Sequence, residues 1–149
     1  MKTTLKIFAL SFSFLFLLSS CADEEPAAPV ITNFELGYDN NKVAYRGDDL
    51  HMDAEIVAEA RIDRIQVEIH HEGEHDKKSS VVIVFDTMEW EFENTWTDFS
   101  GLKKTTFHEH IEIPLDAETG DYHFHFLVID QEGNVTDFET DFEVLDPVE

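Results

Sequence analysis

The stretch that decides the fold reads YHFHFLVI at residues 122–129. Its first five positions alternate between tyrosine or phenylalanine and histidine. Successive side chains of a β-strand point to opposite faces, so the large rings share one face and His123 and His125 share the other. The stretch therefore predicts a strand with one face in a core and the other in solvent.

The same alternation recurs on both sides of this strand, and no long segment shows a helical period. Residues 131–134, Gln-Glu-Gly-Asn, have the composition of a hairpin turn. One or two further strands are expected between His71 and Thr106. Together these patterns predict an all-β fold, a single antiparallel sandwich of about seven to nine strands over residues 30–146. The other predicted strands are residues 30–36, 50–56, 65–70, 107–113 and 136–144.

The segment before the deciding strand, residues 115–122, resembles the corner that precedes the sixth strand of immunoglobulin-like domains. In that corner a tyrosine hydroxyl bonds back to the backbone a few residues upstream. Tyr122 takes this position, and Phe124 takes the inward position that a cysteine holds in antibodies. The resemblance implies an immunoglobulin-like sandwich without the antibody disulfide.

The chain is strongly acidic, with 10 basic and 33 acidic side chains in 149 residues and a net charge of −23. Removal of residues 1–20, which carry two lysines and no acid, leaves 8 basic and 33 acidic groups and a charge of −25. Such a surface repels phosphate backbones, so we expect no nucleic-acid partner. With 42% hydrophobic residues the chain is too apolar for a disordered acidic tail.

The N-terminus has the order of segments that is typical of an export signal. Lys2 and Lys6 precede a twelve-residue apolar run at residues 7–18, which is too short to span a bilayer. The run ends in Leu18-Ser19-Ser20-Cys21, which resembles a bacterial lipobox and holds the only cysteine. This resemblance implies a signal peptide at 1–20, cleavage before Cys21 and membrane anchoring by lipid on its sulfur.

An acidic and proline-containing segment, residues 21–29, follows the lipobox as a short tether. Its Asp-Glu-Glu stretch is similar to the surface-export signal of lipoproteins in the Bacteroidota. We therefore expect a lipid-anchored protein of the outer membrane that faces outward. A solvated tether on a periplasmic protein remains the alternative.

Strand parity places most histidines on outward faces. Pairing of the second with the fifth predicted strand, and of the third with the sixth, gives two clusters on opposite faces, with His75 in a loop near the second. These clusters are His51, His108 and His110, and His70, His71, His123 and His125.

Histidines two apart on a strand lie about 6.6 Å apart at Cα, and both rings can tilt toward one ion. A third ring from the neighbouring strand completes a three-histidine site for Zn²⁺ or Cu²⁺. We therefore predict divalent-metal binding and favour the cluster that contains His70, His71, His123 and His125. The competing interpretation is that these rings are polar residues on solvated sheets.

A different function, binding of a glycan or protein without metal, is suggested by Trp90 and Trp96, although filling of the core also explains them. The sequence shows no nucleophile elbow, phosphate loop or serine–histidine–aspartate motif. We therefore expect no catalytic activity and no cofactor other than the metal.

Taken together, these segments resemble a lipoprotein family of the Bacteroidota, domain of unknown function 4625. The resemblance covers most of residues 29–146 and implies a fold and a location, while the family has no known activity. The segments that carry it are residues 45–51, 65–71, 107–114, 120–125 and 130–134.

Overall fold

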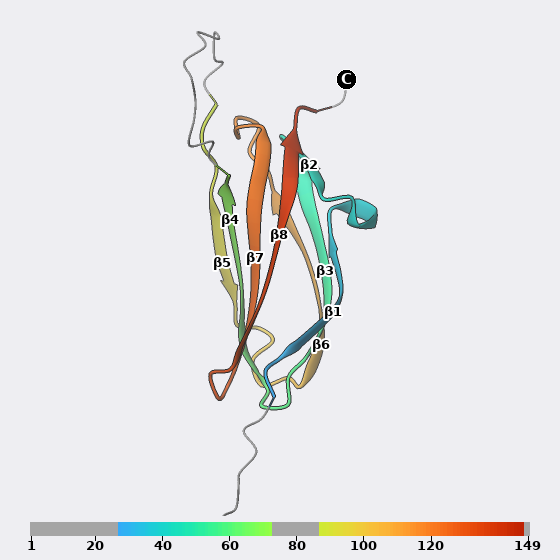
Figure 1. The fold of residues 1–149 in the computed structure, drawn as a ribbon, viewed down its shortest axis with the longest axis vertical. Coiled ribbons are helices and arrows are strands. Elements are labelled where there is room, and N and C mark those ends of the chain that lie inside the picture. The colour runs from blue at the N-terminus through green and yellow to red at the C-terminus, as the bar shows by residue number, and fades with distance from the viewer. Residues whose placement is uncertain (1–26, 73–86, 148–149) are drawn as a thin grey trace, which may run out of the picture.

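A computed structural model describes residues 27–72 and 87–147. In these residues the chain forms eight strands and one short 3₁₀ helix, arranged as two facing sheets (Figure 1). The all-β sandwich predicted from the sequence is confirmed. The elements are β1 (Val30–Leu36), η1 (Tyr38–Asn40), β2 (Val43–Tyr45), β3 (Asp49–Val57), β4 (Ile62–His71), β5 (Phe92–Trp96), β6 (Lys104–Glu112), β7 (Gly120–Asp130) and β8 (Val135–Leu145).

The order of the strands is β1-β3-β6 in one sheet and β2-β8-β7-β4-β5 in the other. Both predicted pairings are confirmed, because β3 pairs antiparallel with β6 and β4 pairs antiparallel with β7. The predicted turn at 131–134 joins β7 to β8 as a hairpin. Among the described residues, no helix is long and apolar enough to cross a membrane.

Two strands were poorly specified by the sequence. β2 was not predicted, because it has only three residues and pairs in parallel with β8, so that no hairpin turn in the sequence indicates it. β5 is one of the strands expected between His71 and Thr106, and it pairs with β4. The apolar stretch at 81–85, a candidate for another strand, lies outside the described residues.

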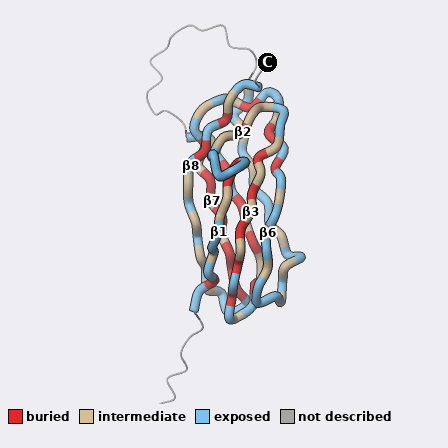
Figure 2. Tube along the Cα trace, turned by 90° about the vertical axis from the view of Figure 1, so that its right-hand side faces the viewer, coloured by how far each residue is buried: buried red, intermediate tan, exposed pale blue. Residues whose placement is uncertain are grey.

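The core lies between the sheets and consists of the inward residues of each alternating strand (Figure 2). Phe107 of β6 meets Phe126 of β7 across the interface, with ring centroids 5.1 Å apart. Trp96 packs edge-on against Phe107, also at 5.1 Å. Each fully buried phenylalanine contributes roughly 1.5–3 kcal/mol relative to an exposed one, so this interface holds the outward faces in register.

An extra residue in β1 changes which face of the sheet the following side chains of that strand point to. The register with β3 shifts between Thr32 and Glu35, and Asn33 adopts a left-handed φ of 51°. This bulge turns Phe34 toward Phe124 and Phe126 while Glu35 joins Asp53 on the outward face.

The predicted tyrosine contact is present. The Tyr122 hydroxyl donates to the carbonyl oxygen of Glu118 at 2.7 Å. Burial, reinforced by the nearby Glu118, raises the pKa of Tyr122 to about 12. The hydroxyl therefore remains a neutral donor, and it fixes the chain where it enters β7.

Asp130 is the one charged side chain that is buried among the described residues, and it organises the β7–β8 turn. Its carboxylate accepts bonds from the backbone N–H of Glu132 and Asn134 and from the Asn134 side chain, each at 2.9 Å. Burial acts to raise the pKa of Asp130, but these hydrogen bonds outweigh it and the net pKa is lowered.

We predict that Asp130→Asn lowers the free energy of unfolding by about 1.5–3 kcal/mol at pH 7, since bonds to a charged acceptor are lost. A carboxyl whose pKa falls on folding stabilises above its unfolded pKa, about 3.9, and loses this contribution as the pH drops through the folded value. The difference from wild type in urea unfolding should therefore shrink as the pH falls below about 3.9. Glu132→Gln, which keeps its backbone donor, is the control; an equal loss there would contradict this role.

Candidate metal centre

The first histidine group lies on the outer face of the three-stranded sheet. In the β3–β6 register, His51 pairs with His110 and Asp53 pairs with His108. Residues 51 and 53 share one face of β3, and residues 108 and 110 share the same face of β6. The register alone therefore collects three imidazoles from two strands.

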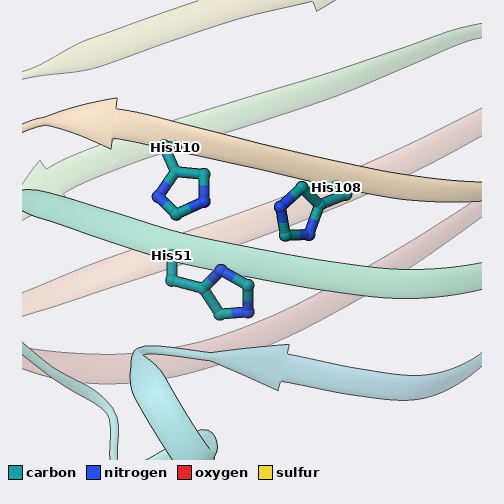
Figure 3. Close-up of side chains that lie close together, drawn as sticks. All are labelled: His51, His108 and His110. Atoms are coloured by element: carbon teal, nitrogen blue, oxygen red, sulfur yellow. The ribbon is translucent and has the colours of Figure 1, made fainter.

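The three rings are equally spaced. Each pair among His51, His108 and His110 has ring centroids 5.1 Å apart. One nitrogen from each ring can be chosen so that all three lie within 4.8 Å of one another. Figure 3 shows one nitrogen of each ring directed into the space between them. Tetrahedral zinc, with bonds of about 2.0–2.1 Å, requires nitrogens about 3.4 Å apart, so the side chains would have to rotate slightly inward to hold it.

Carboxylates fix which nitrogens are free. The Nδ1 of His108 lies 3.1 Å from Oδ2 of Asp53, and the Nδ1 of His110 contacts Oδ2 of Asp49. An ionised carboxylate only accepts hydrogen bonds, so each Nδ1 carries the proton and each Nε2 keeps its lone pair. Such carboxylate–histidine pairs orient metal-binding rings in many proteins.

His51 is held differently. Its side chain is only 12% exposed, and its Nε2 lies 3.7 Å from Oε1 of Glu35. Its Nδ1 is buried and has no hydrogen-bond partner among the described residues. A buried polar atom without a partner is costly, and an ion shared with the other two rings would satisfy it.

Tyr38 covers this ring from η1. The phenol stacks on the imidazole of His51 with centroids 5.2 Å apart and an interplanar angle of 9°. Gly37 makes the approach possible, because its φ of 72° turns the chain while its N–H donates to the carbonyl of His51 at 2.9 Å. One side of the three-histidine group is thus shielded, while His108 and His110 remain exposed.

The second group lies on the outer face of the five-stranded sheet and differs from the predicted set. Ligand atoms of His123, His125 and Glu139 lie within 4.8 Å of one another. His70 flanks them, with its ring centroid 5.4 Å from that of His123. The carboxylate of Asp141 accepts a hydrogen bond from Nδ1 of His123 at 2.5 Å, which raises the pKa of His123.

The structure does not bring His71 to this group. Consecutive residues of a strand point to opposite faces, so His71 lies on the other side of β4 from His70. Its ring packs edge-on against Tyr122 with centroids 4.9 Å apart. His75 lies outside the described residues.

The two tryptophans also pack inward. Trp96 contacts Phe107, and Trp90 lies 5.6 Å from Tyr122 between ring centroids. Both are partly buried against the core. Their rings therefore pack against the hydrophobic core in this structure.

Sequence reasoning missed several partners of the histidines. The register through the β7–β8 turn places Glu139 opposite His125 and Asp141 opposite His123, and the position of that turn was sufficient to derive it. No sequence pattern indicated that Glu35 and Tyr38 lie beside His51. Their positions depend on the bulge in β1 and on the positive φ of Gly37.

Similarity to solved structures is confined to the fold. OgpA from Akkermansia muciniphila aligns with a TM-score of 0.54 at 10% identity, over 80% of this chain and 29% of that chain. The sporulation control protein Spo0M from Bacillus subtilis gives 0.47 at 12% identity over 79% and 49%. A Niemann-Pick type C2 protein from the Japanese carpenter ant gives 0.44 at 6% identity over 80% and 91%.

This chain therefore spans less than a third of OgpA and about half of Spo0M. No curated protein matches the sequence. A family model does match, over residues 19–145, under the description domain of unknown function DUF4625. The chain belongs to the DUF4625 family.

Proposed function

We propose that this domain is a non-catalytic module that binds a divalent metal, Zn²⁺ or Cu²⁺, through His51, His108 and His110. The observation that carries the proposal is the convergence of three imidazoles, of which His51 directs a buried Nδ1 without a partner into the group. The ligands are Nδ1 of His51 and Nε2 of the other two rings.

The chemistry of the ligands supports this choice of metal. Three neutral imidazoles suit Zn²⁺ and Cu²⁺, whereas Mg²⁺ and Ca²⁺ prefer oxygen ligands. Asp49, Asp53 and Glu35 surround the rings and compensate the charge of the ion. The net charge of −23 over the whole chain also raises the local concentration of cations. A glycan-binding alternative has less support, because Trp90 and Trp96 pack against the core.

The immunoglobulin-like relationship is part of the same proposal. The bond of Tyr122 to Glu118 and the pairing of β4 with β7 support it. So does β2, which joins the edge of the sheet in parallel with β8. We place the metal site on the outside of this sandwich, on the sheet formed by β1, β3 and β6.

The protein acts at a membrane surface in this proposal. Lipid on Cys21 anchors the domain through the acidic tether of residues 21–29, at the outer face of the outer membrane. This proposal rests on the lipobox-like sequence, since Cys21 lies outside the described residues.

We predict that substitution of Cys21 by serine moves the protein from the membrane fraction to the soluble fraction of its native cells, because no acyl chain remains. Fractionation with immunoblotting measures this, and accessibility of intact cells to a protease tests the outward orientation. Retention of the serine variant in the membrane fraction would contradict the anchor.

We predict that His108→Ala/His110→Ala weakens Zn²⁺ and Cu²⁺ binding to this face at least about 100-fold, because one imidazole remains. Isothermal titration calorimetry on the purified domain at pH 7.5 measures the affinity. Affinity should fall toward pH 5.5, since protons compete with the metal for the imidazole nitrogens. Both the reference protein and this variant carry His123→Ala/His125→Ala, so that the titration reports the affinity of this face alone. Unchanged binding by the His108/His110 variant would refute the proposed site.

We predict that Asp53→Asn weakens metal binding roughly 10- to 100-fold with the stoichiometry unchanged, because a neutral amide replaces the ionised acceptor that orients the ring of His108. Glu55→Gln, two residues along β3 and opposite Thr106, removes the same charge from the same face without touching a ligand. An equal effect of both substitutions would show that only the charge of the surface matters.

A further inference from the structure

We propose that the outer face of the five-stranded sheet holds a second, independent divalent-cation site, built from His123, His125 and Glu139. It differs from the first site in its mixture of imidazole and carboxylate ligands. It stands on its own observations and does not require the three-histidine site to bind.

The ligands are brought together by the register of three strands. His125 pairs directly with Glu139 of β8, and His123 pairs with Asp141 of β8 on one side and with His70 of β4 on the other. All of these residues share the outward parity of their strands. The result is a continuous row of imidazoles on β7 facing a row of carboxylates on β8.

The distances match a site that needs little rearrangement. The rings of His123 and His125 have centroids 4.7 Å apart. The two oxygens of Glu139 reach both rings, with Oε2 3.8 Å from Nε2 of His123 and Oε1 3.6 Å from Nδ1 of His125. Glu139 therefore already bridges the two imidazoles, in the position a shared ion requires.

Further carboxylates orient this group. Asp141 bonds Nδ1 of His123 at 2.5 Å, which leaves Nε2 for the ion. Asp137 lies 3.5 Å from Nδ1 of His125, on the other flank of Glu139. With both rings about three-quarters buried at the side chain, the imidazoles are confined while the carboxylates reach solvent.

Two histidines and one carboxylate on one face form a ligand set that accepts Zn²⁺ and also harder ions such as Mn²⁺ and Fe²⁺. The three-histidine group, with nitrogen ligands only, favours Cu²⁺ and Zn²⁺. The two faces therefore differ in metal preference. Since the hydrophobic core separates the sheets, the two sites share no ligand and no ligand-orienting group.

Metal stoichiometry tests this directly. Purified, tag-free domain is saturated with Zn²⁺, passed through a desalting column and measured by elemental analysis. Wild type should retain two equivalents. His125→Ala/Glu139→Gln should retain one, and His51→Ala/His108→Ala/His110→Ala should retain the other one. Circular dichroism checks that each variant is folded.

Paramagnetic line broadening by Mn²⁺ supplies a second readout, which requires only single substitutions. Substoichiometric Mn²⁺ should broaden the backbone amide signals around His123, His125 and Glu139 before those around His51. Glu139→Gln should abolish this preference, while Glu143→Gln should preserve it, because Glu143 has the same charge and lies on the same face of β8 four residues away.

One equivalent of Zn²⁺ in both wild type and the His125/Glu139 variant would overturn the second site and leave the first intact. Loss of one equivalent only in the His125/Glu139 variant would support the second site and argue against the first. Mn²⁺ broadening that Glu139→Gln does not alter would also overturn the proposal.

Discussion

The antiparallel register of β7 with its two neighbours is the constraint on which the rest of this structure depends. Because side chains alternate between faces, a slip of one residue would bury His123 and His125 and expose Phe124 and Phe126. The phenylalanines of β7 meet the rings of β1 and β6 in the core, which makes such a slip very unfavourable. The arrangement of the histidines is thus fixed by hydrophobic packing on the opposite face of the same strands.

The fold was predictable because this constraint is visible in the sequence as an alternation of apolar and polar residues with a period of two. The strands with long alternation were all located, as was the turn that Asp130 now organises. β2 was missed because three residues in parallel pairing carry no periodic signal. Glu109 interrupts the inward pattern of β6, yet the register there is continuous, and the residue is half-buried on an edge strand.

The candidate sites were only partly predictable. Parity and strand pairing correctly grouped His51 with His108 and His110, but they did not show which nitrogens remain free. That depends on Asp49, Asp53 and the buried position of His51 under Tyr38. The preference for the other cluster included His71, whose parity places it against Tyr122. The structure accordingly moves the emphasis to the three-histidine face.

The acidic residues of the chain also act locally, in addition to making nucleic-acid binding unfavourable. Carboxylates lie beside the histidines on both outer faces and hold the protons of particular ring nitrogens. These carboxylates thus orient the imidazoles, which supports the proposed cation sites. The proposal relies on this organisation, because histidines scattered over a solvated sheet would lack such orienting partners.

Imidazole ¹H–¹⁵N spectra recorded during a Zn²⁺ titration test the central claim most directly, because they report which nitrogen of each histidine binds. The account predicts coordination through Nδ1 of His51 and through Nε2 of His108 and His110, with one ion bound by these three rings. Unshifted signals from these three rings at saturating Zn²⁺ would contradict it.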